Sequence, residues 1–227
     1  MNFVIIGLGN FGASLAKILT ALGHDVIGVD KDMEKVEFFK DKIKNTVSMD
    51  ITDIHALKTL PLKDCDNVIV CIGDDFGSSV KTTAQLRKLG VKKIYGRESS
   101  LIHKTVLNQI GVDETINPEY DTAVLFAEKL IMPGVWSIYN ISDDIKIAEI
   151  SIPEEYVGKK LSDVGLTAFR NLSVLALKYP DKKQSTPSLE KWAAIENRNF
   201  NTDITLEKGM RFVVQGKKKD IIDYMAL

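Results

Sequence analysis

The sequence contains few of the residues from which metal sites, disulfide frameworks and nucleic-acid surfaces are built. Its 227 residues include two cysteines and three histidines, and 30 basic side chains are balanced by 31 acidic ones, which gives a formal net charge of -1. This balance removes the usual electrostatic reason for a nucleic-acid partner. Cys65 and Cys71 lie in or beside an apolar segment and not at the spacing of metal ligands, so we expect reduced thiols and a cytoplasmic location.

Long apolar runs are missing as well. The longest, such as residues 68–73, end well before the roughly 20 residues that a helix needs to cross a bilayer. If the protein acts at a membrane, another protein must therefore supply the membrane-spanning part.

The first 120 residues alternate short β-rich runs with amphipathic helical stretches, which is typical of a parallel sheet covered on both faces. The predicted strands cover residues 2–6, 25–29, 45–48, 67–71, 93–95 and 114–116, and the predicted helices cover 11–22, 33–42, 53–60, 75–89, 99–110 and 120–131. Gly23, Gly90 and Gly111 each follow a helical run, where a left-handed residue commonly ends a helix. The pattern predicts an α/β fold with a doubly wound parallel sheet of the Rossmann type.

The pattern changes in the C-terminal part, where strand-like runs at 145–152, 173–177 and 211–214 accompany helical segments at 160–164 and 218–226. This composition predicts a small α+β domain. We expect a nucleotide-binding domain over residues 1–117, a crossover helix and linker over 118–140, and the α+β domain over 141–227.

A glycine-rich turn follows the first predicted strand. Gly7, Gly9 and Gly12 form the pattern G-x-G-x-x-G directly before a predicted helix, and this context makes an otherwise common pattern informative. Gly7 can take the tight turn, Gly9 lets a pyrophosphate approach the backbone, and Gly12 lets the helix lie close to the sheet. The free N–H groups of the helix start favour an anion. The alternative is a tight turn in another kind of α/β protein.

Acidic residues come at the ends of the next strands. Asp30, 18 residues after Gly12, can accept both hydroxyls of an adenosine ribose and would repel a 2′-phosphate, which favours NAD or an adenine nucleotide over NADP. Asp50 and Thr52 end the third strand, and Asp74 follows the fourth. For Asp50 and Asp74, a role as helix N-caps is an equal alternative to ligand contact.

Groups suited to catalysis are scarce. The three histidines lie at helix ends or in amphipathic helices, and we expect each on the surface. Cys71 is expected to be a buried structural thiol. An NAD-dependent oxidoreductase is the alternative function, but residues 145–227 contain no histidine, so a lysine or a tyrosine such as Tyr139 or Tyr156 would have to act as proton donor. We expect no enzymatic activity.

Longer stretches resemble a known family. The segments "VIIGLGNFGASLAKILTALGHDVIGVDKDMEKV", "DNVIVCIGDD" and "HKTVLNQIGVDETINPEYDTAVLFAEKL" are similar to the regulator-of-conductance-of-potassium (RCK) domain of KtrA-type and TrkA-type subunits of Ktr and Trk potassium uptake systems. "YVGKKLSDVGL", "VLALK" and "LEKGMRFVVQGKKKDI" resemble their small C-terminal domain. The resemblance implies a homo-oligomeric, octameric ring on the inner face of the membrane, in which bound ADP, ATP, NAD or NADH changes the ring's shape and so controls a potassium-transport subunit of the KtrB or TrkH type.

The resemblance also implies roles for further residues. Arg97 matches a basic residue that reaches the nucleotide phosphates, and the alternative is a solvated arginine paired with Glu98. Glu119 matches an acidic residue near which a divalent or monovalent cation helps to bridge phosphates between subunits, and the alternative is a carboxylate favoured by the start of a helix. The complete expected site is Gly7, Gly9, Asn10, Phe11, Gly12, Asp30, Lys31, Asp50, Ile51, Thr52, Ile72, Gly73, Asp74, Arg97 and Glu119.

Two positions depart from the family pattern. Asn10 stands where Ktr-type proteins usually have an arginine that stabilises the terminal phosphate, so ADP, AMP or NAD(H) become stronger candidates than ATP. Thr167 stands where relatives that bind cyclic di-adenosine monophosphate have an arginine, so that ligand is not expected. The apolar face of the helix at 120–131, with Val124, Leu125 and Leu130, followed by Met132 and Trp136, favours a crossover into a partner subunit over packing on its own sheet.

Overall fold

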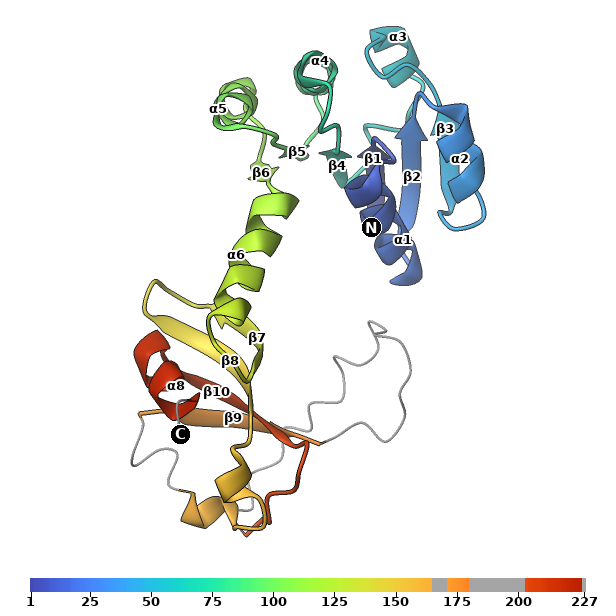
Figure 1. Ribbon diagram of the computed structural model, residues 1–227. Helices are drawn as coiled ribbons and strands as arrows, with labels where there is room; N and C mark the ends of the chain where they lie inside the picture. Colours follow the sequence, from blue (N-terminus) through green and yellow to red (C-terminus); the bar gives the residue numbers. More distant parts are fainter. Residues whose placement is uncertain (165–170, 180–202, 226–227) are drawn as a thin grey trace. The chain divides into compact units, whose positions relative to one another are not determined.

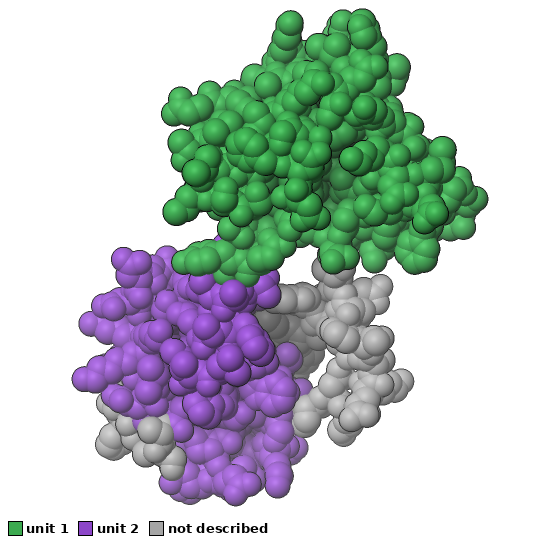
Figure 2. All heavy atoms as spheres, turned by 45° about the horizontal axis from the view of Figure 1, so that its top comes forward, with its two compact units in different colours: residues 1–120 green, residues 121–227 purple. Residues whose placement is uncertain are grey.

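The computed structural model describes residues 1–164, 171–179 and 203–225, and the chain divides into two compact units, Met1–Tyr120 and Asp121–Leu227 (Figure 2). Thr167 lies outside the described residues. In the described part of the chain, no helix combines the length and the apolar character that crossing a bilayer requires.

The first unit contains a six-stranded parallel sheet in the order β3-β2-β1-β4-β5-β6, which is the order of the Rossmann fold (Figure 1). Its strands are β1 (Asn2–Ile6), β2 (Asp25–Asp30), β3 (Asn45–Ser48), β4 (Asn67–Val70), β5 (Ile94–Arg97) and β6 (Glu114–Ile116). Its helices are α1 (Asn10–Ala21), α2 (Met33–Phe39), α3 (Ile54–Leu57), α4 (Phe76–Lys88) and α5 (Leu101–Ile110), and α6 (Pro118–Leu130) follows. The doubly wound sheet is confirmed.

Two apolar clusters cover the two faces of this sheet. Successive residues of a strand point to opposite faces. On β1, Val4 and Ile6 accordingly join the cluster that includes α3 and α4, while Ile5 joins the cluster that includes α1. Because both faces are buried, the central strands β1, β2 and β4 are apolar over most of their length. The carboxyl ends of these parallel strands lie at one edge of the sheet.

Glycines end three of the helices as the sequence predicts. Gly23, Gly90 and Gly111 have φ values of 83°, 77° and 90°, respectively, in the left-handed region. Several helices are shorter than predicted: α2 ends at Phe39, and the helix predicted at 53–60 has only the four residues of α3.

The second unit is built on an antiparallel sheet in the order β7-β8-β10-β9. Its elements are β7 (Val135–Asn140), β8 (Ile145–Ser151), the 3-10 turns η1 (Glu154–Tyr156) and η2 (Leu161–Asp163), β9 (Ser173–Lys178), β10 (Arg211–Lys217) and α8 (Lys218–Met225). Phe212 and Ile150 of the sheet pack with Ile221 and Tyr224 of α8 in its core.

Strand β7 was not predicted, and it lies inside the expected linker over 118–140. Met132, Val135 and Ile138 are buried in the core of the second unit. The register of β7 against β8 shifts between Val135 and Ser137, so the two-residue alternation that identifies a strand in a sequence is interrupted there. The helix predicted at 160–164 is only the short turn η2.

Candidate functional site

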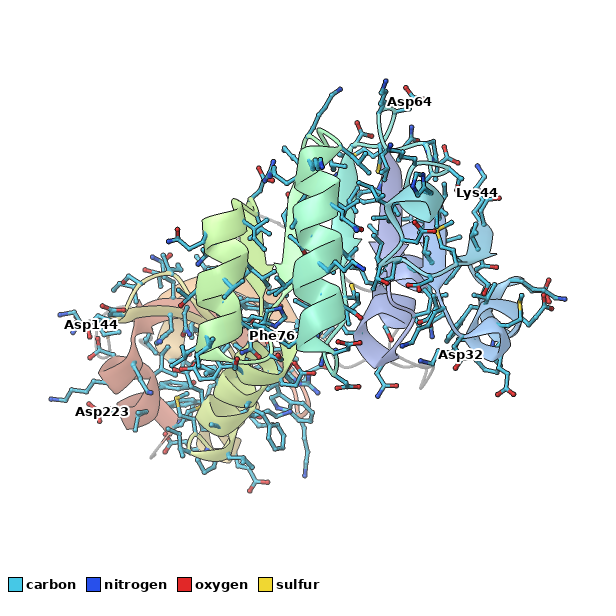
Figure 3. The ribbon with its side chains drawn as sticks, turned by 90° about the horizontal axis from the view of Figure 1, so that it is seen from above. Asp32, Lys44, Asp64, Phe76, Asp144 and Asp223 are labelled. Atoms are coloured by element: carbon cyan, nitrogen blue, oxygen red, sulfur yellow. The ribbon has the colours of Figure 1, made fainter. Side chains whose placement is uncertain are left out.

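The carboxyl ends of the parallel strands form one edge of the first unit. Figure 3 shows this edge at Asp32 and Phe76, which follow β2 and β4, and the opposite edge at Lys44 and Asp64, which precede β3 and β4. In a sheet of this type, ligands bind beyond the carboxyl ends of the strands. Most of the expected site residues lie in the segments that leave this edge.

Gly7 and Gly12 are required by the local fold. Gly7 has a φ of 96°, and this left-handed conformation turns the chain out of β1. Its N–H donates to the Val29 carbonyl of β2 at 2.7 Å. A Cβ at Gly7 would lie 3.3 Å from the carbonyl carbon of Cys71, and a Cβ at Gly12 would overlap the carbonyl oxygen of Gly7. These two glycines therefore fix the turn and bring α1 close to the sheet.

Gly9 is different, because the fold gives no reason for its missing side chain. It has a φ of -72° and an extended ψ of -172°, and a Cβ placed there would meet no atom within 4 Å. The residue is exposed, as is Asn10 beside it. The space that a side chain would occupy is left open directly above the backbone of the turn.

The start of α1 also has no capping group of its own. The first N–H groups of a helix have no intrahelical acceptor, and Gly9 in the N-cap position offers no side chain to accept from them. The first turn, which includes Phe11, contains no acidic residue. By contrast, α2, α3, α4 and α5 are capped by the side chains of Asp32, Asp53, Asp75 and Ser100. The start of α1 can therefore accept an external anion.

Asp30 ends β2 and lies against this turn. One carboxylate oxygen accepts from the N–H of Leu8 at 2.7 Å, and the other accepts from the N–H of Asp32 at 3.0 Å. Lys35 Nζ lies 3.9 Å from the first oxygen. The carboxylate thus ties the end of β2 to the glycine turn, while the neighbouring Lys31 is exposed.

The residues after β3 form a separate small turn. Asp50 accepts from the N–H of Thr52 at 2.9 Å and from its hydroxyl at 2.8 Å, and these two hydrogen bonds hold the pKa of Asp50 below its ordinary value. Ile51 is buried. The cap of α3 is Asp53, so the interpretation of Asp50 as an N-cap is wrong.

The segment after β4 contains Ile72, Gly73 and Asp74. Asp74 is exposed, and the cap of α4 is Asp75, which accepts from the N–H of Ser78 at 2.9 Å. The interpretation of Asp74 as an N-cap is therefore also wrong.

Arg97 and Glu119 form an ion pair at the ends of β5 and β6. The expected alternative, a pair between Arg97 and Glu98, is wrong. Glu98 is buried and lies 3.4 Å from both the Lys104 ammonium and the Asn117 amide nitrogen. Because successive residues of a strand point to opposite faces, neighbours such as Arg97 and Glu98 rarely meet.

His103 is fully buried, which contradicts the expectation that each histidine lies on the surface. The N–H of Ser99 donates to Nδ1 at 3.2 Å, so Nε2 carries the proton and lies 3.1 Å from the hydroxyl of Ser79 on α4. Burial lowers the pKa of His103. In the same turn of α5, Leu101 and Ile102 are 81% and 72% exposed. The histidine is therefore buried and the two apolar side chains are exposed, which is the reverse of what their residue types favour.

This burial predicts that the first unit becomes less stable in mild acid. The unfolded chain takes up a proton at His103 near pH 6.5, whereas the folded chain resists protonation because the pKa is lowered. The contribution of neutral His103 to the free energy of unfolding is therefore fully present above pH 6.5. Below pH 6.5, the free energy of unfolding falls by at most about 1.4 kcal/mol per pH unit. Urea denaturation between pH 7.5 and 5.5 should show a smaller pH slope for His103→Gln than for the wild type. The exposed His55→Gln is the control, and equal slopes in all three proteins would contradict the prediction.

The two thiols are buried, as expected for Cys71. Burial raises the pKa of Cys71 to about 12, and the charge of Arg97 opposes this rise. Such a thiol is a poor nucleophile. Within the described ranges, no three histidine, cysteine, aspartate or glutamate side chains gather as they would around a metal ion.

Comparison with known proteins identifies the family. A family model described as the TrkA-N domain matches residues 3–118. Ktr system potassium uptake protein A of Bacillus subtilis (strain 168) is 31% identical over 220 residues, which are 97% of this chain and 93% of that protein.

Two solved structures are also similar. The GsuK RCK domain has a TM-score of 0.64 at 16% identity over 100% of this chain and 47% of its own, so this chain spans less than half of that structure. The NAD(P)-binding domain of an exopolyphosphatase-related protein from Archaeoglobus fulgidus has a TM-score of 0.51 at 27% identity, over 57% of this chain and 97% of its own. Because the family model matches more than half of the residues, and the Bacillus relative aligns with almost all of them, this chain belongs to the TrkA-N domain family.

Proposed function

We propose that the chain is a nucleotide-sensing, non-enzymatic subunit of a potassium uptake system. It binds an adenine nucleotide, ADP or ATP, or NAD or NADH, at the carboxyl edge of the first unit. The bound nucleotide changes the shape of a homo-oligomer, and this change controls a membrane potassium-transport subunit from its cytoplasmic side. A ligand that binds two shapes with different affinity shifts the equilibrium between them without any reaction.

The observation that carries this proposal is the open space at Gly9. The fold of the first unit leaves room for a side chain at Gly9. A pyrophosphate that lies on the backbone of the turn would collide with such a side chain. The uncapped start of α1 supplies the N–H groups for that anion, and Asp30 lies beside the turn to accept ribose hydroxyls. The similar domain from Archaeoglobus fulgidus is named as NAD(P)-binding, which supports a dinucleotide or a related ligand.

The alternative function, an NAD-dependent oxidoreductase, would need a proton donor that faces the ligand. His103, the residue of the first unit best suited to that role, is neutral and fully buried between Ser79 and Ser99. The relative from Bacillus subtilis is named as a potassium uptake protein. Both observations favour sensing over catalysis.

The identity of the nucleotide depends partly on Asn10. This residue is exposed beside Gly9 and has no charge, so it cannot offset the extra charge of a terminal phosphate as an arginine could. ADP, AMP and NAD(H) are therefore favoured over ATP. Glu119 is 64% exposed at the same edge, and we assign to it a second role beside a cation at the phosphates.

Helix α6 supports an assembly of several copies. It contains no buried residue, and Leu125, Phe126 and Leu130 are exposed along it, followed by Ile131. Exposed apolar surface of this kind marks protein interaction sites. We propose that α6 crosses to a second copy and that such dimers assemble into the octameric ring.

Calorimetric titration with ATP, ADP, AMP, NAD and NADH tests the proposal, and light scattering gives the oligomer size. Asp30→Asn should bind the preferred nucleotide at least about 10-fold more weakly, because it loses a charged acceptor of the ribose hydroxyls and one of the two acceptors that hold the Leu8 and Asp32 N–H groups. Asp41→Asn, an exposed residue at the opposite edge, is the matched control. A small oligomer that oxidises NADH with an added substrate would refute the proposed function.

A further inference from the structure

Three neighbouring strand ends hold one guanidinium group. Arg97 ends β5, Gly73 follows β4, and Glu119 lies in the first turn of α6, just after β6. An Nη atom of Arg97 donates to a carboxylate oxygen of Glu119. A Cβ at Gly73 would overlap the other Nη atom and Cζ of the arginine. The guanidinium is therefore held between the backbone of Gly73 and the Glu119 carboxylate, and its side chain is only 19% exposed.

The hydrogen-bonding capacity of Arg97 is not used up by this pair. Its Nε is buried and has no hydrogen-bond partner among the described residues. A guanidinium has five N–H donors in a planar fork that matches a phosphate group as well as a carboxylate. Glu119 is a weak competitor for these donors, because its carboxylate is largely exposed and water screens the pair.

The arginine also lies close to the glycine turn. Its charge acts on the Cys71 thiol, and the Cβ of Cys71 would lie 3.0 Å from a Cβ placed at Gly12. Gly7 and Gly12 of the glycine turn therefore lie against Cys71, and the Arg97 guanidinium lies against Gly73, two residues further along the same segment after β4. A phosphate on the turn would be within the electrostatic influence of this arginine.

We propose that Glu119 and a phosphate group of the ligand compete for Arg97, and that Gly73 leaves the space in which the guanidinium is held for this exchange. The proposal rests on the proposed function, because it needs a phosphate-containing ligand at the glycine turn. When the phosphate takes Arg97, Glu119 is released. A carboxylate at the start of a helix is still favoured by the helix dipole, so the cost of its release is small. Binding of the ligand therefore changes the contacts of the first turn of α6, where Glu119 lies.

Calorimetry with ADP and adenosine, in buffer with a chelator and no divalent cation, tests the competition. Glu119→Gln should raise the affinity for ADP by about two- to fivefold, the factor of an exposed ion pair, and leave that for adenosine unchanged. Arg97→Gln should lower the affinity for ADP by about 10-fold or more, because a charge-assisted contact is lost. In the Arg97→Gln background, Glu119→Gln should have no further effect.

The outcomes separate this inference from the proposed function. If the wild type binds neither ADP nor adenosine, the proposed function and the competition for Arg97 are both refuted. If the wild type binds ADP, but Glu119→Gln lowers its affinity, leaves it unchanged, or acts equally without Arg97, only the competition is overturned. Gly73→Ala is a second variant that displaces the guanidinium, and it should weaken ADP binding but not adenosine binding. Gly77→Ala, where a Cβ would meet only Asp75 at 3.6 Å, is its control.

Discussion

Gly9→Ala is expected to weaken nucleotide binding by about 100-fold or more, which corresponds to about 2.7 kcal/mol, without a loss of thermal stability. The backbone angles of Gly9 are open to alanine, and its Cβ would meet no atom of the fold. An alanine is slightly unfavourable in the N-cap position but also restricts the unfolded chain, so its two small effects on stability oppose each other. The methyl group would occupy the space that the phosphate needs. Calorimetry and a thermal melt of the same preparation measure both quantities.

Gly12→Ala is the informative comparison for this result. Its Cβ would overlap the carbonyl oxygen of Gly7, so this variant should lose both stability and binding. Gly77→Ala, outside the glycine turn, should retain both. If Gly9→Ala binds nucleotide as the wild type does, the phosphate does not lie on this turn, and the role assigned to it is wrong.

Glu128→Leu is expected to destabilise the second unit by about 3 to 5 kcal/mol, because it leaves a buried ammonium without its counter-charge. Lys146 on β8 is 5% exposed, and its Nζ lies 3.3 Å from Glu128. Lys218 lies 3.5 Å from the same carboxylate oxygen. Both tryptophans, Trp136 and Trp192, fall in residues 121–227. Tryptophan fluorescence during urea denaturation therefore reports on this unit.

Two variants identify the buried charge as the cause. Glu128→Leu combined with Lys146→Met removes both charges and should recover most of the lost stability, since an apolar pair replaces a buried ion pair at little cost. Asp203→Asn breaks an exposed pair with Lys160 and should change the stability by less than about 1 kcal/mol. A double variant as unstable as Glu128→Leu would show that the damage comes from packing.

The first unit could be predicted from its sequence because local signals and tertiary structure agree there. The central strands β1, β2 and β4 are short and mostly apolar, and glycine residues end three of the helices, α1, α4 and α5. The second unit is less easily predicted from the sequence, because β7 has a register shift and its exposed positions include Trp136 and Tyr139. With Val135 and Ile138 buried and two aromatic residues exposed, the alternation of apolar and polar residues on which strand prediction depends is lost.

The positions of the candidate site residues could be predicted, but many of their partners could not. A strand end is a property of the chain, so Asp30 and Arg97 were expected at the correct edge. The partner of a side chain depends on rotamers and on neighbouring strands. Arg97 consequently pairs with Glu119 on the next strand end and not with Glu98. The burial of His103 depends on the serine hydroxyls that surround it, and no pattern in the sequence shows this.

The contact between the glycine turn and β4 also constrains how this sequence can evolve. The Cβ of Cys71 lies next to Gly12, and the backbone of Cys71 lies next to Gly7. A larger side chain at residue 71 would push α1 away from the sheet and disturb the turn. Small residues at 71 and glycine at 12 should therefore be inherited together, so that a change at one is accepted only where the other permits it.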